Sequence, residues 1–597
     1  MDLKVYREHT KVTRRFKEAE LVLKNAKIIN VFTNEIITGD IAIEDGMIVG
    51  IGNYEGKQEH DMTGKYVCPG FIDSHLHLES TLVTPKELVT AASRHGTTTF
   101  IVDPHESANV SGLAGINYIL DQTEDASANV FVMMPSCVPA TSIDDNGCTL
   151  TAEDMTQYLD NERVLGLGEV MDYISVVNAD PGMHRKLDLF KDKVRDGHAP
   201  FLAEEDLQAY VMAGISTDHE CSDFQYAMRE RRNGMTVLIR EGSAAKNLEA
   251  IVKGIVENNI PVEGFCFCTD DKHIEDIERE GHIDYNVRKA IELGMNPVSA
   301  IKMATIYPAI CYGFHNLGAV APGYQADLVV LNDLNKISIE NVYYKGEVIE
   351  QEEEIEIKKC PDDLEKMTIQ DVYYKGRKID QDGEIIVKEC PSELKNTVHV
   401  GKFSKNDLQL ESPTGYFPVI EMQEGQITTK KQIKKFSGGK CLFLSNAQYQ
   451  KIAVIERHKS TGKTGVGIVS GFGIQKGAIA SSVSHDSHNI IVIGDNDEDM
   501  VLAVQELIRT QGGYTIVADH KIFDTLELPV MGLMSDAGYQ YNNHKLKNMI
   551  NKAHEMGVGR GIDPFITLSF MALPVIPEVR ITPRGVYDVL GGEFCSY

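Results

Sequence analysis

The stretch PGFIDSHLHLES, residues 69–80, joins a short apolar run to two histidines that lie one residue apart. Alternate side chains of a β-strand point to the same face, so His75 and His77 are expected to project together from the end of a strand. Two imidazoles on one face can bind a single metal ion, and a polar strand end with two solvated histidines is the simpler alternative. Further ligands elsewhere in the chain would favour the metal site.

Short apolar runs like this one recur downstream and alternate with helical segments, which is the pattern of βα units on a parallel sheet. Eight runs lie between residues 67 and 270: VCPGFID, TTTFIVD, NVFVMMP, VLGLGEV, GHAPFL, GISTD, MTVLIR and GFCFCTD. Eight βα units predict a TIM-type (β/α)8 barrel, with the fifth and sixth runs weak in strand propensity. The barrel is expected to end with helices near 286–313.

Strand patterns also flank the barrel. Residues 1–66 begin as a short amphipathic helix and continue as strands separated by turns, and PGYQADLVVL (322–331) returns to that pattern. The segment 341–364 is repeated at 371–394, which we interpret as a duplicated hairpin. We therefore predict an α/β protein with four parts. They are the helix and first β part at 1–66, the barrel at 67–315, the second β part at 316–398, and a separate α+β domain at 399–597.

The composition limits the partners of this chain. Among 597 residues the formal net charge is −29, which argues against nucleic acid or an anionic membrane as partner. The 11 cysteines form no CxxC pair, and neither a signal peptide nor a spanning apolar run is present, so a cytoplasmic protein is expected. The acidic surface and the size of the β domain lead us to expect a homodimer.

Nitrogen and oxygen donors follow most of the eight runs, at the face where barrel active sites lie. These residues are His75, His77, Asp103, His105, Glu106, Glu169, His198, His219, Glu241, Asp270 and Asp271. Any one of them can be explained as a polar loop residue. Placing five of the chain's 19 histidines at these positions is better explained by a metal site. Imidazole and carboxylate ligands suit Zn, Mn or Fe(II).

Four histidines and two carboxylates are enough to hold two metal ions about 3.5–4 Å apart. Glu169 lies on the middle run, and its two oxygens make it the natural bridge between the ions. Two cations lower the pKa of a bound water toward neutrality and thereby supply a hydroxide nucleophile. Asp270 can bind one ion and accept the proton of the hydroxide as a general base.

Taken together, the motifs resemble the bacterial adenine deaminases of the amidohydrolase superfamily. The matching stretches are PGFIDSHLHLEST, DPHESANV, GEVMDY, DGHAP, STDHE, REGSAAKNL and FCTDDKH, followed by SHDSHNIIVIG, LPVMGLMSDAG and LPVIPEVRIT. The resemblance implies hydrolysis of adenine to hypoxanthine and ammonia, with two Mn(II) or Fe(II) ions and Zn(II) as the alternative. It also implies six ligands: His75, His77, Glu169, His198, His219 and Asp270. Glu169 stands where many relatives use a carboxylated lysine.

The sequence leaves several roles open. A second carboxylate must protonate a ring nitrogen, and Glu106 and Glu241 are equal candidates; both can equally be explained as support for the histidines. Arg240 is expected to form an ion pair rather than a substrate contact. The SHDSHN stretch at 484–489 can cap the pocket, bind metal, or be a polar turn between strands.

Two other functions compete with adenine deamination. A hydrolase of a cyclic amide, such as a hydantoin- or dihydroorotate-like ring, would use the same barrel, and a lysine in place of Glu169 would favour it. A barrel that has lost catalysis and serves as a binding module would lack some of the ligands, and none is missing here.

Overall fold

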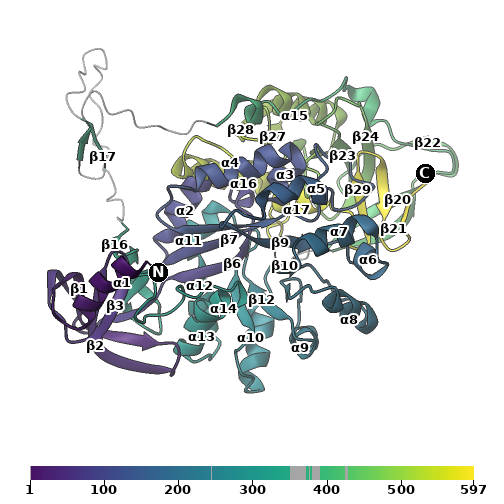
Figure 1. The fold of residues 1–597 in the computed structure, drawn as a ribbon. Helices are drawn as coiled ribbons and strands as arrows, with labels where there is room; N and C mark the ends of the chain where they lie inside the picture. The colour runs from purple at the N-terminus through teal and green to yellow at the C-terminus, as the bar shows by residue number, and fades with distance from the viewer. Residues whose placement is uncertain are drawn as a thin grey trace, which may run out of the picture.

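The computed structural model describes residues 2–243, 245–349, 372–374, 377–379, 390–423 and 428–596. Over these ranges the chain is a mixed α/β structure, with a bundle of parallel strands between a small sheet at its N-terminal side and a larger sheet at its C-terminal side (Figure 1). No helix in these ranges is long and apolar enough to cross a membrane.

Eight parallel strands carry the candidate site, in two sheets. The five-stranded sheet contains β6 (Phe71–Leu76), β7 (Thr97–Val102), β8 (Asn129–Met134), β9 (Val164–Val170) and β10 (Val194–Gly197). The three-stranded sheet contains β11 (Thr217–Asp218), β12 (Thr236–Arg240) and β13 (Phe265–Cys268). Backbone hydrogen bonds join the sheets at both edges: Ser216 N donates to Arg195 O at 3.0 Å, and Asp270 N donates to His75 O at 3.0 Å.

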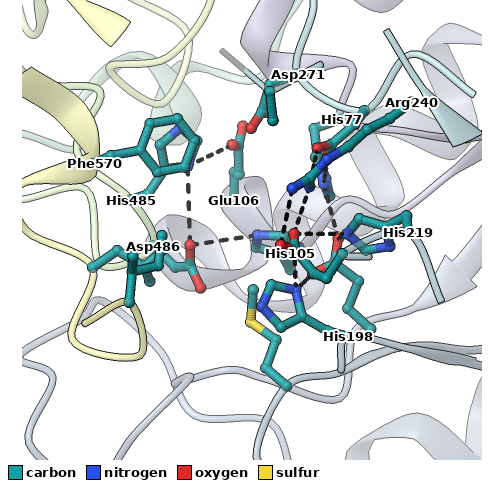
Figure 2. Close-up of a pocket in the computed structure, with 17 residues that line it drawn as sticks. His77, His105, Glu106, His198, His219, Arg240, Asp271, His485, Asp486 and Phe570 are labelled. Atoms are coloured by element: carbon teal, nitrogen blue, oxygen red, sulfur yellow. Dashed lines mark hydrogen bonds and ion pairs between the residues drawn. The ribbon is translucent and has the colours of Figure 1, made fainter. Parts of the chain in front are cut away.

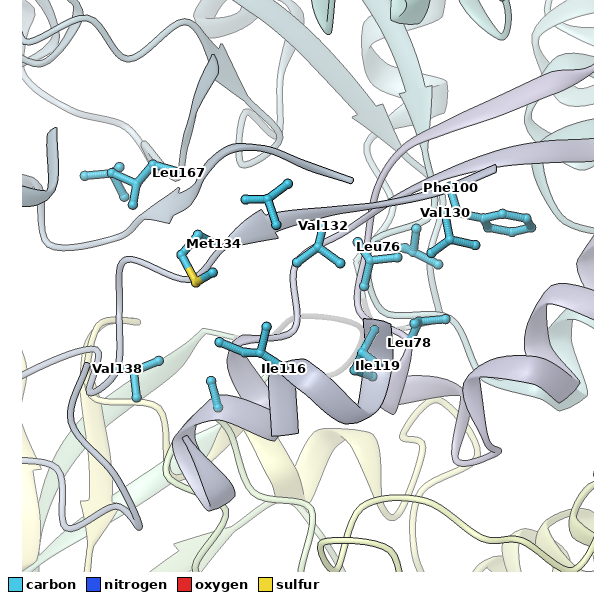
Figure 3. Close-up of a cluster of buried hydrophobic side chains, with 14 of the residues drawn as sticks. Leu76, Leu78, Phe100, Ile116, Ile119, Val130, Val132, Met134, Val138 and Leu167 are labelled. Atoms are coloured by element: carbon cyan, nitrogen blue, oxygen red, sulfur yellow. The ribbon is translucent and has the colours of Figure 1, made fainter. Parts of the chain in front are cut away.

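Helices alternate with these strands and cover them. They are α2 (Pro85–Ser93), α3 (His105–Ser111), α4 (Leu113–Gln122), α5 (Ala152–Met155), α6 (Tyr173–Val177), α7 (Pro181–Leu189), α8 (Glu204–Met212), α9 (Phe224–Arg232), α10 (Leu248–Glu257), α11 (Ile274–Glu280), α12 (Ile283–Glu292), α13 (Pro297–Met303) and α14 (Ile306–Cys311). Figure 3 shows Ile116 and Ile119 of α4 facing Leu76 and Val132 of the strands, all fully or almost fully buried. Strands covered in this way read as continuous apolar runs, which is why the sequence reveals them.

Two of the predicted runs differ from the observed strands. The run VCPGFID is split at Gly70 into β5 (Tyr66–Pro69) of the small sheet and β6. A Cβ at Gly70 would lie 2.1 Å from Thr98 Oγ1, so the crossing point requires glycine. The fifth run was placed too late, because the strand is Val194–Gly197 and most of GHAPFL is loop. Charged residues hide this strand in the sequence; Asp196 is buried and accepts a hydrogen bond from Thr217 Oγ1 at 2.8 Å.

The small sheet combines strands from both flanks of the parallel strands. It contains β1 (Ala19–Asn30), β2 (Glu35–Glu44), β3 (Met47–Gly52), β4 (Gly56–Asp61), β5, β14 (Leu328–Asp333), β15 (Ser338–Tyr344) and β16 (Glu347–Val348), beside α1 (Leu3–Thr13). Antiparallel pairing of β5 with β14 joins the two flanks. Both copies of the repeat contain a hairpin at the same place. In the first copy it is formed by β15 and β16, and in the second copy by β17 (Val372–Tyr374) and β18 (Arg377–Ile379). Most of its remainder lies outside the described residues.

The C-terminal part is an α+β unit built on an eight-stranded sheet. The strands, in spatial order, are β21 (Thr429–Lys435), β20 (Tyr416–Met422), β24 (Thr464–Ser470), β23 (Tyr449–Ile455), β26 (Ile490–Gly494), β25 (Gly477–Ser481), β27 (Gly513–Ala518) and β28 (Lys521–Glu527). Helices α15 (Asp497–Arg509), α16 (Tyr539–Glu555) and α17 (Ile566–Phe570), the pair β19 (Glu411–Ser412)–β22 (Cys441–Leu442), and the strands β29 (Val579–Thr582), β30 (Gly585–Asp588) and β31 (Glu593–Phe594) complete it. Leu82, Val110 and Tyr118 of the barrel segment belong to its hydrophobic cluster, so the two units share a core.

Candidate metal centre

His75 and His77 meet at the C-terminal end of β6. Their side chains project together, as the alternation of a strand predicts, and their Nε2 atoms lie 3.3 Å apart. Both imidazoles are buried. The Nδ1 of His77 is 2.9 Å from the backbone oxygen of Asp103, a contact that fixes the ring with Nε2 toward the centre of the site.

Glu169, near the end of β9, lies between four histidines. Its Oε1 is 2.8 Å from His75 Nε2, and its Oε2 is 3.3 Å from His198 Nδ1. Several compact groups of donor atoms share this carboxylate. His75, His77 and Asp270 form one, His198 and His219 form another, and Asp103 and His105 form a third. A carboxylate in this position can contact two cations at once.

Asp270 follows β13 and closes the first of these groups. Its Oδ1 is 3.2 Å from His77 Nε2, and its Oδ2 accepts a hydrogen bond from Arg240 Nη1 at 2.8 Å. Its φ of 59° lies in the left-handed region, which costs of order 1–3 kcal/mol in a non-glycine residue. The hydrogen bond from its backbone N–H to His75 O stabilises this conformation and brings the carboxylate over β6.

The electrostatics of the site keep both carboxylates ionised. Burial by itself would raise the pKa of Glu169, but the neighbouring imidazoles, His219 and His77 first among them, outweigh burial and hold the pKa well below its usual value. Burial likewise opposes the charge of Asp270, and Arg240 outweighs burial and holds the Asp270 pKa low. Buried carboxylates that remain charged favour a cation between them.

The donor set fits divalent metal ions. Within the part of the chain that the structure describes, Glu169 Oε1 and His198 Nδ1 are buried and form no hydrogen bond. Four imidazoles and two carboxylates are the ligand types that Zn(II), Mn(II) and Fe(II) accept. The structure thus brings together all six residues that the sequence nominates as ligands.

A pocket opens over this cluster. One side is formed by the strand ends, and the opposite side comes from the C-terminal unit, with Phe570, Leu573 and Ile576 as apolar groups and His485 and Asp486 as polar ones (Figure 2). Such a pocket can hold a flat ring on apolar side chains and contact its polar edge.

The structure separates the two candidate proton donors. Glu106, in the first turn of α3, lines the pocket, and its Oε1 is 3.0 Å from His485 Nδ1. Glu241 does not line the pocket; its Oε1 accepts a hydrogen bond from Lys289 Nζ at 2.7 Å. Arg240 forms ion pairs, as the sequence predicts.

Sequence reasoning did not single out Glu220, which binds Arg240 Nη2 through Oε2 at 2.9 Å and lines the pocket. Its position directly after His219 at a strand end was the available signal. The roles of His485 and Asp486 were left open, since no spacing relates the C-terminal unit to the strand ends.

Comparisons with known proteins place these residues in a family. Residues 66–377 match the amidohydrolase family, and residues 426–593 match the adenine deaminase C-terminal domain. An adenine deaminase of Desulfitobacterium hafniense is 54% identical over 581 residues, and one of Clostridium acetobutylicum is 46% identical over 583; each match covers 97% of both chains. A crystal structure of a beta-aspartyl dipeptidase from Fervidobacterium islandicum AW-1, 17% identical, aligns with a TM-score of 0.43 over 55% of this chain and 96% of that one. The chain belongs to the adenine deaminase family of amidohydrolases.

Proposed function

We propose that this protein hydrolyses adenine to hypoxanthine and ammonia. The observation that carries the proposal is Glu169, which is shared by two groups of proposed ligands beneath a pocket that has Phe570, Leu573 and Ile576 on one side. Membership of the adenine deaminase family supports the choice of substrate, because its relatives match over nearly the whole chain.

The cofactor we propose is a pair of divalent ions, Mn(II) or Fe(II), with Zn(II) as the alternative. His75, His77 and Asp270 would hold one ion, His198 and His219 the other, and Glu169 both. Bound ions of this kind supply a hydroxide nucleophile at neutral pH, because they lower the pKa of water.

The protein's own side chains position the substrate and move protons. Asp270 is placed to take the proton of the attacking oxygen and pass it to the departing amine. Arg240 keeps Asp270 ionised and oriented through its hydrogen bond at 2.8 Å. Glu106 supplies a carboxylate at the ring-binding side of the pocket, and we propose it in preference to Glu241, which is paired with Lys289.

The surrounding architecture is also part of the proposal. We propose that the two parallel sheets are one (β/α)8 barrel, because backbone hydrogen bonds cross both edges between them. The domain limits are proposed as 1–66 and 316–398 for the small β domain, 67–315 for the barrel and 399–597 for the C-terminal domain. A cytoplasmic homodimer acting on a small molecule, without nucleic acid or membrane, remains our prediction, to be checked by light scattering and by fractionation.

Ammonia release and metal content, measured on the same preparation, test the function. The Mn-loaded protein is expected to release one ammonia for each hypoxanthine formed, with about two metal ions per chain. His77→Ala should abolish bound metal and activity together, because His77 Nε2 contacts both Glu169 and Asp270. Hydrolysis of a cyclic amide without ammonia from adenine would overturn the proposal, as would a fully active protein without metal.

A further inference from the structure

The loop at 484–489, between β25 and β26, reaches from the C-terminal unit into the pocket. Its His485 ring stacks on Phe570, with ring centroids 4.6 Å apart and planes inclined by 24°. The Nδ1 of His485 lies 3.0 Å from Glu106 Oε1 (Figure 2). An imidazole and a carboxylate from two separate parts of the chain therefore meet at the wall of the pocket.

This pair is built to carry a proton. His485 is 6% exposed and Glu106 is fully buried, so their interaction is little screened by water. Burial opposes the charge on His485, but Asp271, Glu106 and Asp486 outweigh it and raise the His485 pKa to about 9. The same interaction, with His485 as its largest favourable contributor, keeps the pKa of Glu106 below its usual value despite burial.

The loop is held in place from several sides. Arg457 is fully buried and donates from Nε to the backbone oxygen of His488. Asn489 Nδ2 donates to the backbone oxygen of Asp145 in the barrel segment at 2.8 Å. The position of His485 is thus fixed before substrate binds, which is the condition for an effective proton donor.

We propose that His485 is a catalytic residue, and that it forms with Glu106 a proton-transfer pair which protonates the purine ring nitrogen next to the reacting carbon. Glu106 binds Nδ1 and orients the imidazole, leaving Nε2 to reach the ring. This division of labour between a histidine and a carboxylate is common in enzyme active sites. The inference rests on the proposed adenine deamination and adds the residue that the barrel alone lacks.

The proposed step balances. The oxygen of water bonds to carbon 6 while the ring nitrogen beside it takes a proton from the His485–Glu106 pair. The remaining proton of that oxygen moves through Asp270 to the amino group, and the carbon–nitrogen bond breaks to release ammonia. The pair recovers its proton from the next water molecule when that molecule ionises. The sum is adenine plus water giving hypoxanthine plus ammonia.

Two substitutions at one position test the proposal. His485→Ala should lower kcat by about 100-fold or more, the usual contribution of general acid catalysis, while KM and metal content change less than about threefold. Added imidazole should restore part of the activity of His485→Ala, because the space vacated by the ring adjoins the pocket. His485→Asn can still donate a hydrogen bond to Glu106 but cannot transfer a proton, so it should be as slow as His485→Ala.

His520→Asn and His520→Ala are the matched controls. His520 lies in the same unit and its Nδ1 contacts Asp499 at 2.9 Å, but its side chain is exposed and outside the pocket. Both controls should keep wild-type kcat, with and without imidazole.

Three outcomes would count against the proposals. If the wild-type protein converts adenine and His485→Asn is equally active, His485 is not the proton donor and the inference is overturned. Loss of metal in both His485 variants would also overturn it, because Glu106, His485 and His488 would then act as metal ligands. A wild-type protein inactive on adenine would instead refute the proposed function.

Discussion

The proposed pair of metal ions depends on Glu169. Its Oε1 lies 2.9 Å from His77 Nε2, and its Oε2 lies 3.3 Å from His198 Nδ1, so one carboxylate serves both groups of ligands. Glu169→Gln replaces one oxygen by an amide nitrogen, which cannot bind a cation. We expect metal content well below two ions per chain, measured by mass spectrometry, and kcat at least about 100-fold lower.

The control for this variant is Glu249→Gln on α10. Glu249 is exposed and pairs only with Lys253 among the contacts the structure describes, so the same chemical change there should leave metal content and kcat as in wild type. Full metal occupancy in Glu169→Gln would show that the bridge is assigned to the wrong residue.

Helix α9 supports the two strand ends that carry His198 and His219. Its Glu230 is fully buried in a group with Asp218 and Cys221. The Asp218 carboxylate accepts hydrogen bonds from the backbone N–H groups of Ala199 at 2.6 Å and Cys221 at 3.0 Å, which fixes the loops after β10 and β11. Burial, followed by the charge of Asp218, raises the pKa of Glu230 to about 11, so this side chain is neutral in the folded protein.

Glu230 therefore makes the stability of the fold depend on pH. Below a pH of about 4.5, the ordinary pKa of glutamate, Glu230 is protonated in both the folded and the unfolded protein. Its ionisation then makes no difference to the free energy of unfolding. At higher pH the unfolded chain ionises while the folded protein stays protonated, so stability falls by roughly 1.4 kcal/mol for each pH unit. Glu230→Gln keeps the neutral shape, and its free energy of unfolding should rise relative to wild type between pH 5 and pH 8, measured by urea denaturation.

Glu257→Gln, at the exposed end of α10, is the matched control and should show no such trend. A difference between Glu230→Gln and wild type that stays constant from pH 5 to pH 8 would mean that Glu230 is ionised in the folded protein.

At the scale of the whole molecule, the sequence predicts the features that depend on neighbouring residues, such as strands and the donor side chains at their ends. Apolar runs revealed seven of the eight parallel strands, and residues at or just after the ends of the predicted runs supplied all six proposed ligands. Val194–Gly197 was missed because its charges are buried by distant partners, Tyr312 among them. The approach of His485 to Glu106 joins positions 379 residues apart and depends on how two units pack, which no local pattern encodes.

That packing makes a prediction about ligand binding across the molecule. If the pocket is formed by both units, bound product must stabilise both, because opening either one would lose contacts with the ring. Hypoxanthine added to the metal-loaded protein should slow amide hydrogen exchange at 103–107 and at 484–489, by up to about 100-fold when hypoxanthine is present at 100 times its Kd. Exchange in α1 (Leu3–Thr13), which lies beside the small sheet and does not line the pocket, should stay unchanged. Protection confined to the barrel segment, with 484–489 unaffected, would show that the C-terminal unit does not contact the ligand.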